Sequence, residues 1–244
     1  MIDGLKIDFY REESDLTEDD ILFECFLEEA KINDDESVYL SVKKFHFDAS
    51  QLSLDDWFKV RIFLKDDIKD IIYLDFKDFI FEDGMVKGIL IFPDDDFPLH
   101  RVYVYNFFVR WKRGELIDWK KLSAETEKES WIRACFHWTG IATSITQNGV
   151  YVLDANLVSS RTDFYCLLGE VLFGYRGYIG AEGNALLDCL IILSRLGKEH
   201  NSILQIVNSK RLKEVFEVEK YDGDRGIVEV YDVMERHGFK IEFN

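Results

Sequence analysis

The chain has 244 residues, of which 47% are hydrophobic and 15% aromatic, so it holds enough apolar side chains for sizeable cores and is not mainly disordered. Its formal net charge of −17 at pH 7 argues against sequence-independent binding to nucleic acid or to anionic lipid, which both attract basic proteins. The length suits one or two domains, and the charge suits a basic protein partner.

The acidic side chains are concentrated near the start of the chain. Residues 1–100 carry 27 acidic and 11 basic side chains, whereas residues 141–244 carry 15 and 11. The rhythm of apolar residues also changes after about residue 140. We therefore predict two domains, residues 1–140 and residues 141–244.

The four cysteines, Cys25, Cys135, Cys166 and Cys189, are scattered and show no spacing typical of a zinc site, so we expect no metal site. Cys166 and Cys189 fall in apolar helical segments and are predicted to be buried and reduced. The first residues lack the basic and apolar regions of a signal peptide, and no apolar stretch is long enough for a bilayer. We expect a cytoplasmic protein that does not bind membranes.

The first 140 residues mix strand-like and helix-like patterns. Alternating or continuous apolar residues predict strands at residues 5–10, 38–47, 71–81, 86–92 and 102–111. Helical spacing predicts helices at residues 17–32, 54–64 and 124–137, the last entered from Ser123 as its cap. Asp83-Gly84 is a strong hairpin signal. We expect an α+β domain with a mostly antiparallel sheet, for which the sequence indicates no role.

Residues 141–244 alternate short apolar strands with helices, which is typical of a small parallel α/β layer. The strands are expected at residues 150–153, 203–207 and 239–243. The helices are expected at residues 161–173, 184–196, 210–216 and 227–237, with a turn at residues 221–226.

The helix at residues 184–196 has two distinct faces. Helical spacing places Ala185, Leu186, Cys189, Leu190 and Leu193 on one of them, which is predicted to face the core. Asn184, Leu187, Asp188 and Ile191 share the other. An acid among apolar groups is compatible with an ordinary solvated or structural face and with a face that binds a partner.

The glycine-rich segment 174–183 contains Tyr175 and Tyr178 but lacks the spacing of a dinucleotide-binding or phosphate-binding loop. It is either a plain connection between helices or a recognition loop, since aromatic residues are frequent interface anchors. The five histidines have no common spacing, and no catalytic string is present. We therefore expect neither an enzyme nor a cofactor.

Residues 178–190 join this segment to the two-faced helix. They read Tyr178-Ile179-Gly180-Ala181-Glu182-Gly183-Asn184-Ala185-Leu186-Leu187-Asp188-Cys189-Leu190. The stretch resembles the barstar family of intracellular ribonuclease inhibitors, with matches at Tyr178, Gly180, Ala185, Leu186, Asp188, Cys189 and Leu190. The order of the flanking strands and helices agrees as well, so the resemblance covers about residues 149–244.

The resemblance implies a barstar-like α/β domain with a three-stranded parallel sheet and flanking helices. In that family, the aspartate that matches Asp188 enters the ribonuclease active site and occupies a phosphate position among basic groups. Tyr178 and Gly180 match the loop that packs beside this site. The resemblance thus implies an immunity protein or antitoxin whose partner is a basic nuclease toxin, without direct binding to nucleic acid.

The chain also departs from the family pattern. Ile179 replaces the second aromatic residue, Asn184 replaces the first aspartate of the helix, and Leu187 replaces an aromatic residue. The family's glutamate on the last helix corresponds to Val233, with Asp232 beside it. The predicted partner-binding residues are Tyr178, Gly180, Asn184, Leu187, Asp188 and Asp232. An interaction module that shares the fold but does not inhibit a nuclease is the alternative.

Overall fold

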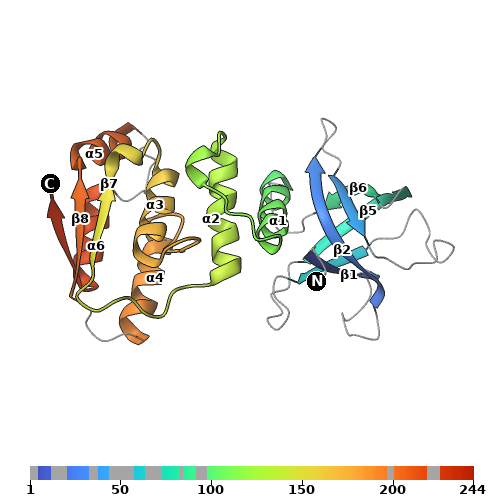
Figure 1. Ribbon diagram of the computed structural model, residues 1–244, viewed down its shortest axis with the longest axis horizontal. Helices are drawn as coiled ribbons and strands as arrows, with labels where there is room; N and C mark the ends of the chain where they lie inside the picture. Colours follow the sequence, from blue (N-terminus) through green and yellow to red (C-terminus); the bar gives the residue numbers. More distant parts are fainter. Residues whose placement is uncertain are drawn as a thin grey trace. The chain divides into compact units, whose positions relative to one another are not determined.

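The computed structural model describes residues 5–11, 21–32, 38–43, 58–63, 73–82, 85–91, 98–196, 201–218 and 226–244. The chain divides into two compact units, Met1–Ile117 and Asp118–Asn244 (Figure 1). The predicted boundary after residue 140 therefore falls inside the second unit, because the helix that precedes it packs against the C-terminal helices.

The first unit is a closed barrel of six antiparallel strands in the order β1-β2-β3-β6-β5-β4. The strands are β1 (Leu5–Arg11), β2 (Ile21–Ile32), β3 (Val38–Lys43), β4 (Phe58–Phe63), β5 (Tyr73–Glu82) and β6 (Met85–Ile91). The mostly antiparallel sheet is confirmed. The hairpin is confirmed too, since Glu82 pairs with Met85, while Asp83 and Gly84 lie outside the described residues.

Two predicted helices of this unit are wrong. Ile21–Ile32 is strand β2, whose register against β3 shifts between Leu27 and Glu29. Leu27 and Ala30 are both buried as a result, and this spacing of three imitates a helical period. Phe58–Phe63 is strand β4, and its sequence alternates apolar and polar residues as a half-buried strand does. Residues 17–20, 54–57 and 64 lie outside the described residues.

The predicted strand at residues 102–111 is also wrong, because α1 (Pro98–Lys112) is a helix that packs on β2. Its buried residues cover most of the helix and include Val102, Val104, Tyr105, Phe107, Phe108, Val109 and Trp111, and a narrow stripe of Leu99, Tyr103, Asn106 and Arg110 is half-buried. This stripe includes the aliphatic Leu99 and the aromatic Tyr103, so the polar face is weak and the many β-branched and aromatic residues imitate a buried strand. Pro98 stands in the first turn, where its missing N–H costs nothing.

Asn106 of α1 forms hydrogen bonds with β2 beyond the point where the described pairing of β2 with β1 ends. Pairing of β2 with β1 ends at Leu27, where Leu5 is its partner. Beyond that point Ala30 N donates to Asn106 Oδ1 at 2.9 Å, and Asn106 Nδ2 donates to Ala30 O at 2.7 Å. The side-chain amide therefore replaces a neighbouring strand and holds α1 on the barrel.

We expect Asn106→Leu to lower the free energy of unfolding of the first unit by about 1–3 kcal/mol, because Ala30 loses both of its hydrogen-bond partners there. Denaturant unfolding and hydrogen exchange at the Ala30 amide measure the effect. The control is Arg113→Ala, which removes one exposed hydrogen bond from Arg113 Nη2 to Glu28 O (3.0 Å) and should cost under about 0.5 kcal/mol. Equal losses in the two variants would contradict the assignment.

The second unit contains the predicted parallel sheet. Strands β7 (Val150–Asp154), β8 (Ser202–Val207) and β9 (Phe239–Phe243) lie in the order β7-β8-β9, and both neighbouring pairs are parallel. The predicted helices are present as α3 (Arg161–Phe173), α4 (Gly183–Leu196), α5 (Ser209–Val218) and α6 (Ile227–Arg236), with the short 3-10 helix η4 (Ala155–Leu157) before α3. The predicted turn at residues 221–226 lies outside the described residues, except for Gly226.

Helix α2 (Glu125–Thr139) forms a further layer of this unit, so that α3 lies between the sheet and α2 (Figure 1). The preceding 3-10 helix η3 (Trp119–Lys121) is attached to α3 as well, because Trp119 Nε1 and Lys120 Nζ both donate to Glu170 Oε2, at 2.8 and 2.6 Å. The predicted Ser123 cap is wrong by one residue. Ala124 is the N-cap, and Glu127 Oε2 accepts hydrogen bonds from the amides of Ser123 and Ala124.

Candidate functional site

The exposed face of α4 carries the residues that the sequence placed there. Asn184, in the first turn, and Asp188, in the second, are exposed, and Leu187 is half-buried. The opposite stripe is buried at Leu186, Cys189, Leu190 and Leu193, while Ala185 at its edge is half-buried. The core stripe therefore anchors the helix, and the carboxylate of Asp188 is presented to solvent on a rigid element.

Gly180 lies at the turn that leads into α4, and the turn requires a glycine. Its φ is +108°, a backbone conformation that residues with a side chain rarely adopt. A Cβ at this position would lie 2.4 Å from the amide nitrogen of Leu186 and 2.7 Å from the carbonyl carbon of Ala185. The segment thus passes directly against the backbone of the helix that carries Asp188.

Gly180→Ala is expected to lower the free energy of unfolding by about 2 kcal/mol, because backbone strain and a contact with immovable helix atoms add together. Gly174→Ala is the matched control. Gly174 also has a positive φ of +81°, but a Cβ there would meet nothing within 4 Å. Strain alone should then cost about 1 kcal/mol. Chemical denaturation compares the two variants, and a larger loss in Gly174→Ala would contradict the close contact at Gly180.

A second pair of glycines sets this loop against α3. A Cβ on Gly177 would lie 2.2 Å from the carbonyl oxygen of Gly169, and a Cβ on Gly169 would lie 2.3 Å from the carbonyl oxygen of Gly177. Gly169 is buried in the middle of α3. The glycines of the segment therefore serve close backbone packing, and the loop is a fixed part of the unit.

Helix α2 holds the loop from the other side. The Phe136 ring lies 4.9 Å from the Tyr178 ring, and the Trp131 ring lies 5.9 Å from the Tyr175 ring, measured between centroids. The guanidinium of Arg176 lies over the ring of Trp138 at 5.2 Å and over that of Tyr175 at 4.9 Å. Thr139 Oγ1 lies 3.1 Å from the carbonyl oxygen of Arg176. Residues 175–178 are thus clamped between α2 and α3.

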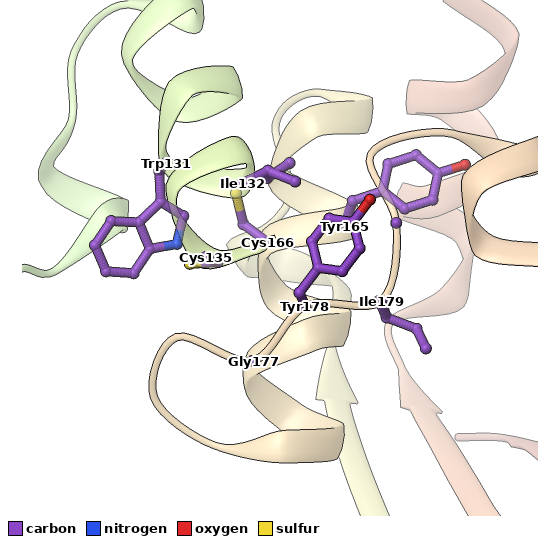
Figure 2. A pocket seen from close by; sticks show the side chains of 9 residues that line it. Trp131, Ile132, Cys135, Tyr165, Cys166, Gly177, Tyr178 and Ile179 are labelled. Carbon is purple, nitrogen blue, oxygen red and sulfur yellow. The ribbon is translucent and has the colours of Figure 1, made fainter. Parts of the chain in front are cut away.

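Figure 2 shows the junction at which these elements meet. Side chains from α2 and α3 surround the segment that includes Gly177 and Tyr178 (Trp131, Ile132, Cys135, Tyr165, Cys166 and Ile179 are the others labelled). The space between them is too small to hold a water molecule. The junction is therefore a packed seam that positions the loop, and it offers no room for a small ligand.

The titratable groups near this seam are less acidic than usual. Burial, followed by the charges of Cys189, Glu182 and Asp188, raises the pKa of Tyr178 to about 12. Burial and the charge of Asp188 raise the pKa of the Cys189 thiol to about 11. Tyr178 is therefore a neutral phenol at physiological pH, and its hydroxyl lies within the field of the carboxylates of α4.

All four cysteines are free and buried, as predicted for Cys166 and Cys189. Burial raises the pKa of Cys135 and of Cys166 well above the usual range for a thiol. Such thiols are poor nucleophiles. Within the part of the chain that the structure describes, no cluster of histidine, cysteine and acidic side chains is arranged to hold a metal ion.

Asp232 is exposed on α6, while its neighbour Val233 is buried. Helices α4 and α6 are in contact, and Ser194 Oγ near the end of α4 lies 2.8 Å from His237 Nδ1, directly after α6. Asp188 and Asp232 thus lie on two helices that are in contact.

Comparisons of the chain with protein-family models, with curated proteins and with solved structures found no match. Among the helices that the structure describes, none is both long and apolar enough to span a bilayer. The geometry of the site includes one element outside the predicted domain, since α2 contacts the loop through Phe136, Trp138 and Thr139.

Proposed function

We propose that the chain is a cytoplasmic immunity protein or antitoxin that inhibits a cytotoxic ribonuclease by inserting the acidic face of α4 into its active site. The observation that carries the proposal is the position of Asp188, which is exposed on a helix whose opposite stripe is buried. The partner is a basic nuclease. The proposed role is inhibition by binding, not catalysis.

The physical argument concerns the chemistry of a nuclease active site. Such a site gathers cationic side chains that bind and stabilise the phosphate of the substrate. A carboxylate on a rigid helix replaces that phosphate without the entropy cost of ordering a flexible side chain and its backbone. Asp188 meets this requirement, because Leu186, Cys189 and Leu190 anchor its helix in the core.

The remaining predicted partner-binding residues belong to α4, to the loop before it and to α6. Asn184 lies one turn earlier on the same helix, and Leu187 is adjacent to Asp188 in the sequence. Tyr178 and Gly180 belong to the clamped loop that leads into α4, and Asp232 lies on the neighbouring helix α6. The resemblance of residues 149–244 to the barstar family supports the same assignment, and so does the order of strands and helices in the second unit.

The proposal is tested with the full chain and the product of a toxin-like gene that lies beside its own. The two proteins are co-expressed and purified through a tag on one of them, and RNA degradation by the nuclease is then followed with and without the chain. Stoichiometric binding that stops RNA degradation is the expected result. A complex that leaves RNA degradation unchanged would refute inhibition, and the absence of any complex would refute this partner.

One observation favours the alternative of an interaction module that does not inhibit a nuclease. The helix carries Asn184 where the family has an aspartate, so it presents one carboxylate fewer to a basic pocket. Such a module would bind a basic protein through the same face without blocking catalysis. The RNA-degradation assay separates the two functions, because only the inhibitor protects the RNA.

A further inference from the structure

Phe136 is a large apolar side chain on the outer side of α2. Its neighbours Trp131, Ile132 and Cys135 are buried, whereas Phe136 is 39% exposed. Its ring packs on Tyr178, which is itself half-buried in the loop that leads to α4. We call these two residues the aromatic pair.

We propose that the aromatic pair is part of the partner-binding surface, so that α2 and α4 together contact the nuclease. This inference rests on the proposed function. On the partner we expect a basic pocket that receives Asp188. Beside this pocket we expect apolar residues that pack on Phe136 and Tyr178. Exposed aromatic residues beside a central charged anchor are typical of interface hot spots.

The surface is continuous from α2 to α4. Tyr178 contacts Phe136 at one end, and two residues later Gly180 passes against the backbone of Ala185 and Leu186 in α4. Burial, Cys189, Glu182 and Asp188 together raise the pKa of Tyr178. The half-buried Leu187 extends the apolar area along α4. A partner that covers Asp188 therefore meets the aromatic pair beside it.

The charges on the α4 side of the surface favour a basic occupant. Glu182, before the start of α4, and Asp188 are exposed, and Asn184 adds a polar group between them. On α2, by contrast, the exposed Arg133 lies one turn before Phe136. Arg176, the basic residue of the loop, is engaged by the rings of Trp138 and Tyr175. An anionic partner such as RNA would be repelled by this surface, whereas the cationic rim of a nuclease is attracted to it.

The tight packing of the loop between α2 and α3 contributes to the affinity for the partner. Gly177 is pressed on Gly169 of α3, and α2 packs on the loop through Phe136, Trp138 and Thr139. A loop that is already held in place loses little conformational freedom when a partner binds, so more of the contact energy appears as affinity. Rigid aromatic side chains add contact area at the same low entropy cost.

Phe136→Ala in the full chain tests this inference. We expect the Kd for the nuclease to rise about tenfold or more, as for the loss of an aromatic hot-spot residue. The matched control is Phe243→Ala on β9. Phe243 is 54% exposed and packs on Tyr231, with ring centroids 5.2 Å apart, but it lies in the sheet, on the side of α3 opposite to α2 (Figure 1). This control should change the Kd less than about threefold.

Hydroxyl-radical footprinting of the wild-type complex separates direct contact from an indirect effect on the loop. Protection of the Phe136 ring on binding, together with the tenfold loss, is the expected result. A loss of affinity without protection of Phe136 would overturn the inference, and so would equal affinities of the two variants. If the wild-type chain binds the nuclease and Asp188→Ala abolishes binding while Phe136→Ala does not weaken it, the inference fails and the proposed function stands. If the wild-type chain does not bind a nuclease at all, the proposed function fails first.

Discussion

Asp188→Ala is expected to weaken binding to the proposed nuclease partner by about 2–4 kcal/mol, the range of strong interface hot spots. Complexes of barstar-family inhibitors with their nucleases are among those that define the upper end of the known hot-spot energies. The loss arises because the variant leaves the buried cations of the nuclease without a counter-charge. The free energy of unfolding should change by less than about 0.5 kcal/mol, since the side chain is exposed and the core stripe of α4 is unaffected. Titration calorimetry and inhibition of RNA degradation measure the loss of binding, and chemical denaturation measures the free energy of unfolding.

Two further variants make the test specific to the charge and its position. Asp188→Asn keeps the size of the side chain and removes its charge, so it should lose most of the affinity that Asp188→Ala loses. Glu217→Ala removes an exposed acid from α5 and should leave the Kd within about threefold. If Asp188→Asn binds as well as the wild type, Asp188 does not act as a phosphate mimic.

Lys128→Met is expected to lower the free energy of unfolding of the second unit by about 3 kcal/mol, near the lower end of the cost of breaking a buried ion pair. Lys128 Nζ on α2 donates to Asp163 Oδ1 on α3 at 2.7 Å, and the side chains of the two residues are 15% and 4% exposed. The loss of Lys128 leaves a buried carboxylate without a counter-charge. Asp163 Oδ2 keeps the hydrogen bond from the Ser159 amide at 2.9 Å, which limits the cost.

An exposed ion pair to the same helix provides the matched control for this prediction. Lys120 Nζ lies 2.6 Å from Glu170 Oε2, but their side chains are 33% and 36% exposed, so Lys120→Met should cost less than about 1 kcal/mol. Adding Asp163→Asn to Lys128→Met should restore part of the stability, because the uncompensated charge is removed. Chemical denaturation compares these three variants with the wild type. Equal costs for Lys128→Met and Lys120→Met would show that burial does not govern the pair.

Lys128→Met should also affect the affinity for the proposed nuclease partner. Helix α2 carries Phe136 and holds the Tyr178 loop, and Lys128 helps to dock α2 on α3. A variant with a loosened α2 should therefore bind the nuclease more weakly than its exposed counterpart Lys120→Met, even at temperatures where both are folded. If Lys128→Met is less stable but binds the nuclease as the wild type does, the packing of α2 on α3 does not contribute to binding.

The elements of the second unit were predictable because local periods or turn signals mark most of them. In β8, Ser202, Leu204 and Ile206 are buried while Ile203, Gln205 and Val207 are half-buried, and its short, nearly continuous apolar run ends at Asn208-Ser209. In α4 the buried Leu186, Cys189, Leu190 and Leu193 recur at helical spacing. A period read over such a segment reports directly which side faces the core.

Two elements of the first unit, α1 and β2, were mispredicted from the sequence because their local pattern does not show which side faces the core. Most of helix α1 is buried, and its narrow half-buried stripe itself contains Leu99 and Tyr103, so its polar period is too weak to distinguish it from a buried strand. Strand β2 contains a register shift between Leu27 and Glu29, and the resulting spacing of Leu27 and Ala30 imitates a helix. In both elements, contacts with distant segments override the local preference of the residues.

By itself, the sequence determined the exposed position of Asp188 through a local helical period, and the character of the two sheets through the Asp83-Gly84 hairpin signal and the alternation of C-terminal strands with helices. Only the tertiary structure decided where the second unit begins. Helix α3 buries Tyr165 and Cys166 in addition to Phe164, Leu167 and Leu168, and the sheet alone covers one side of it. The apolar residues on its other side require a second cover, which α2 supplies from outside the predicted domain. The pairing of Phe136 with Tyr178 follows from that packing, and a contact between residues so far apart in the chain leaves no local pattern in the sequence.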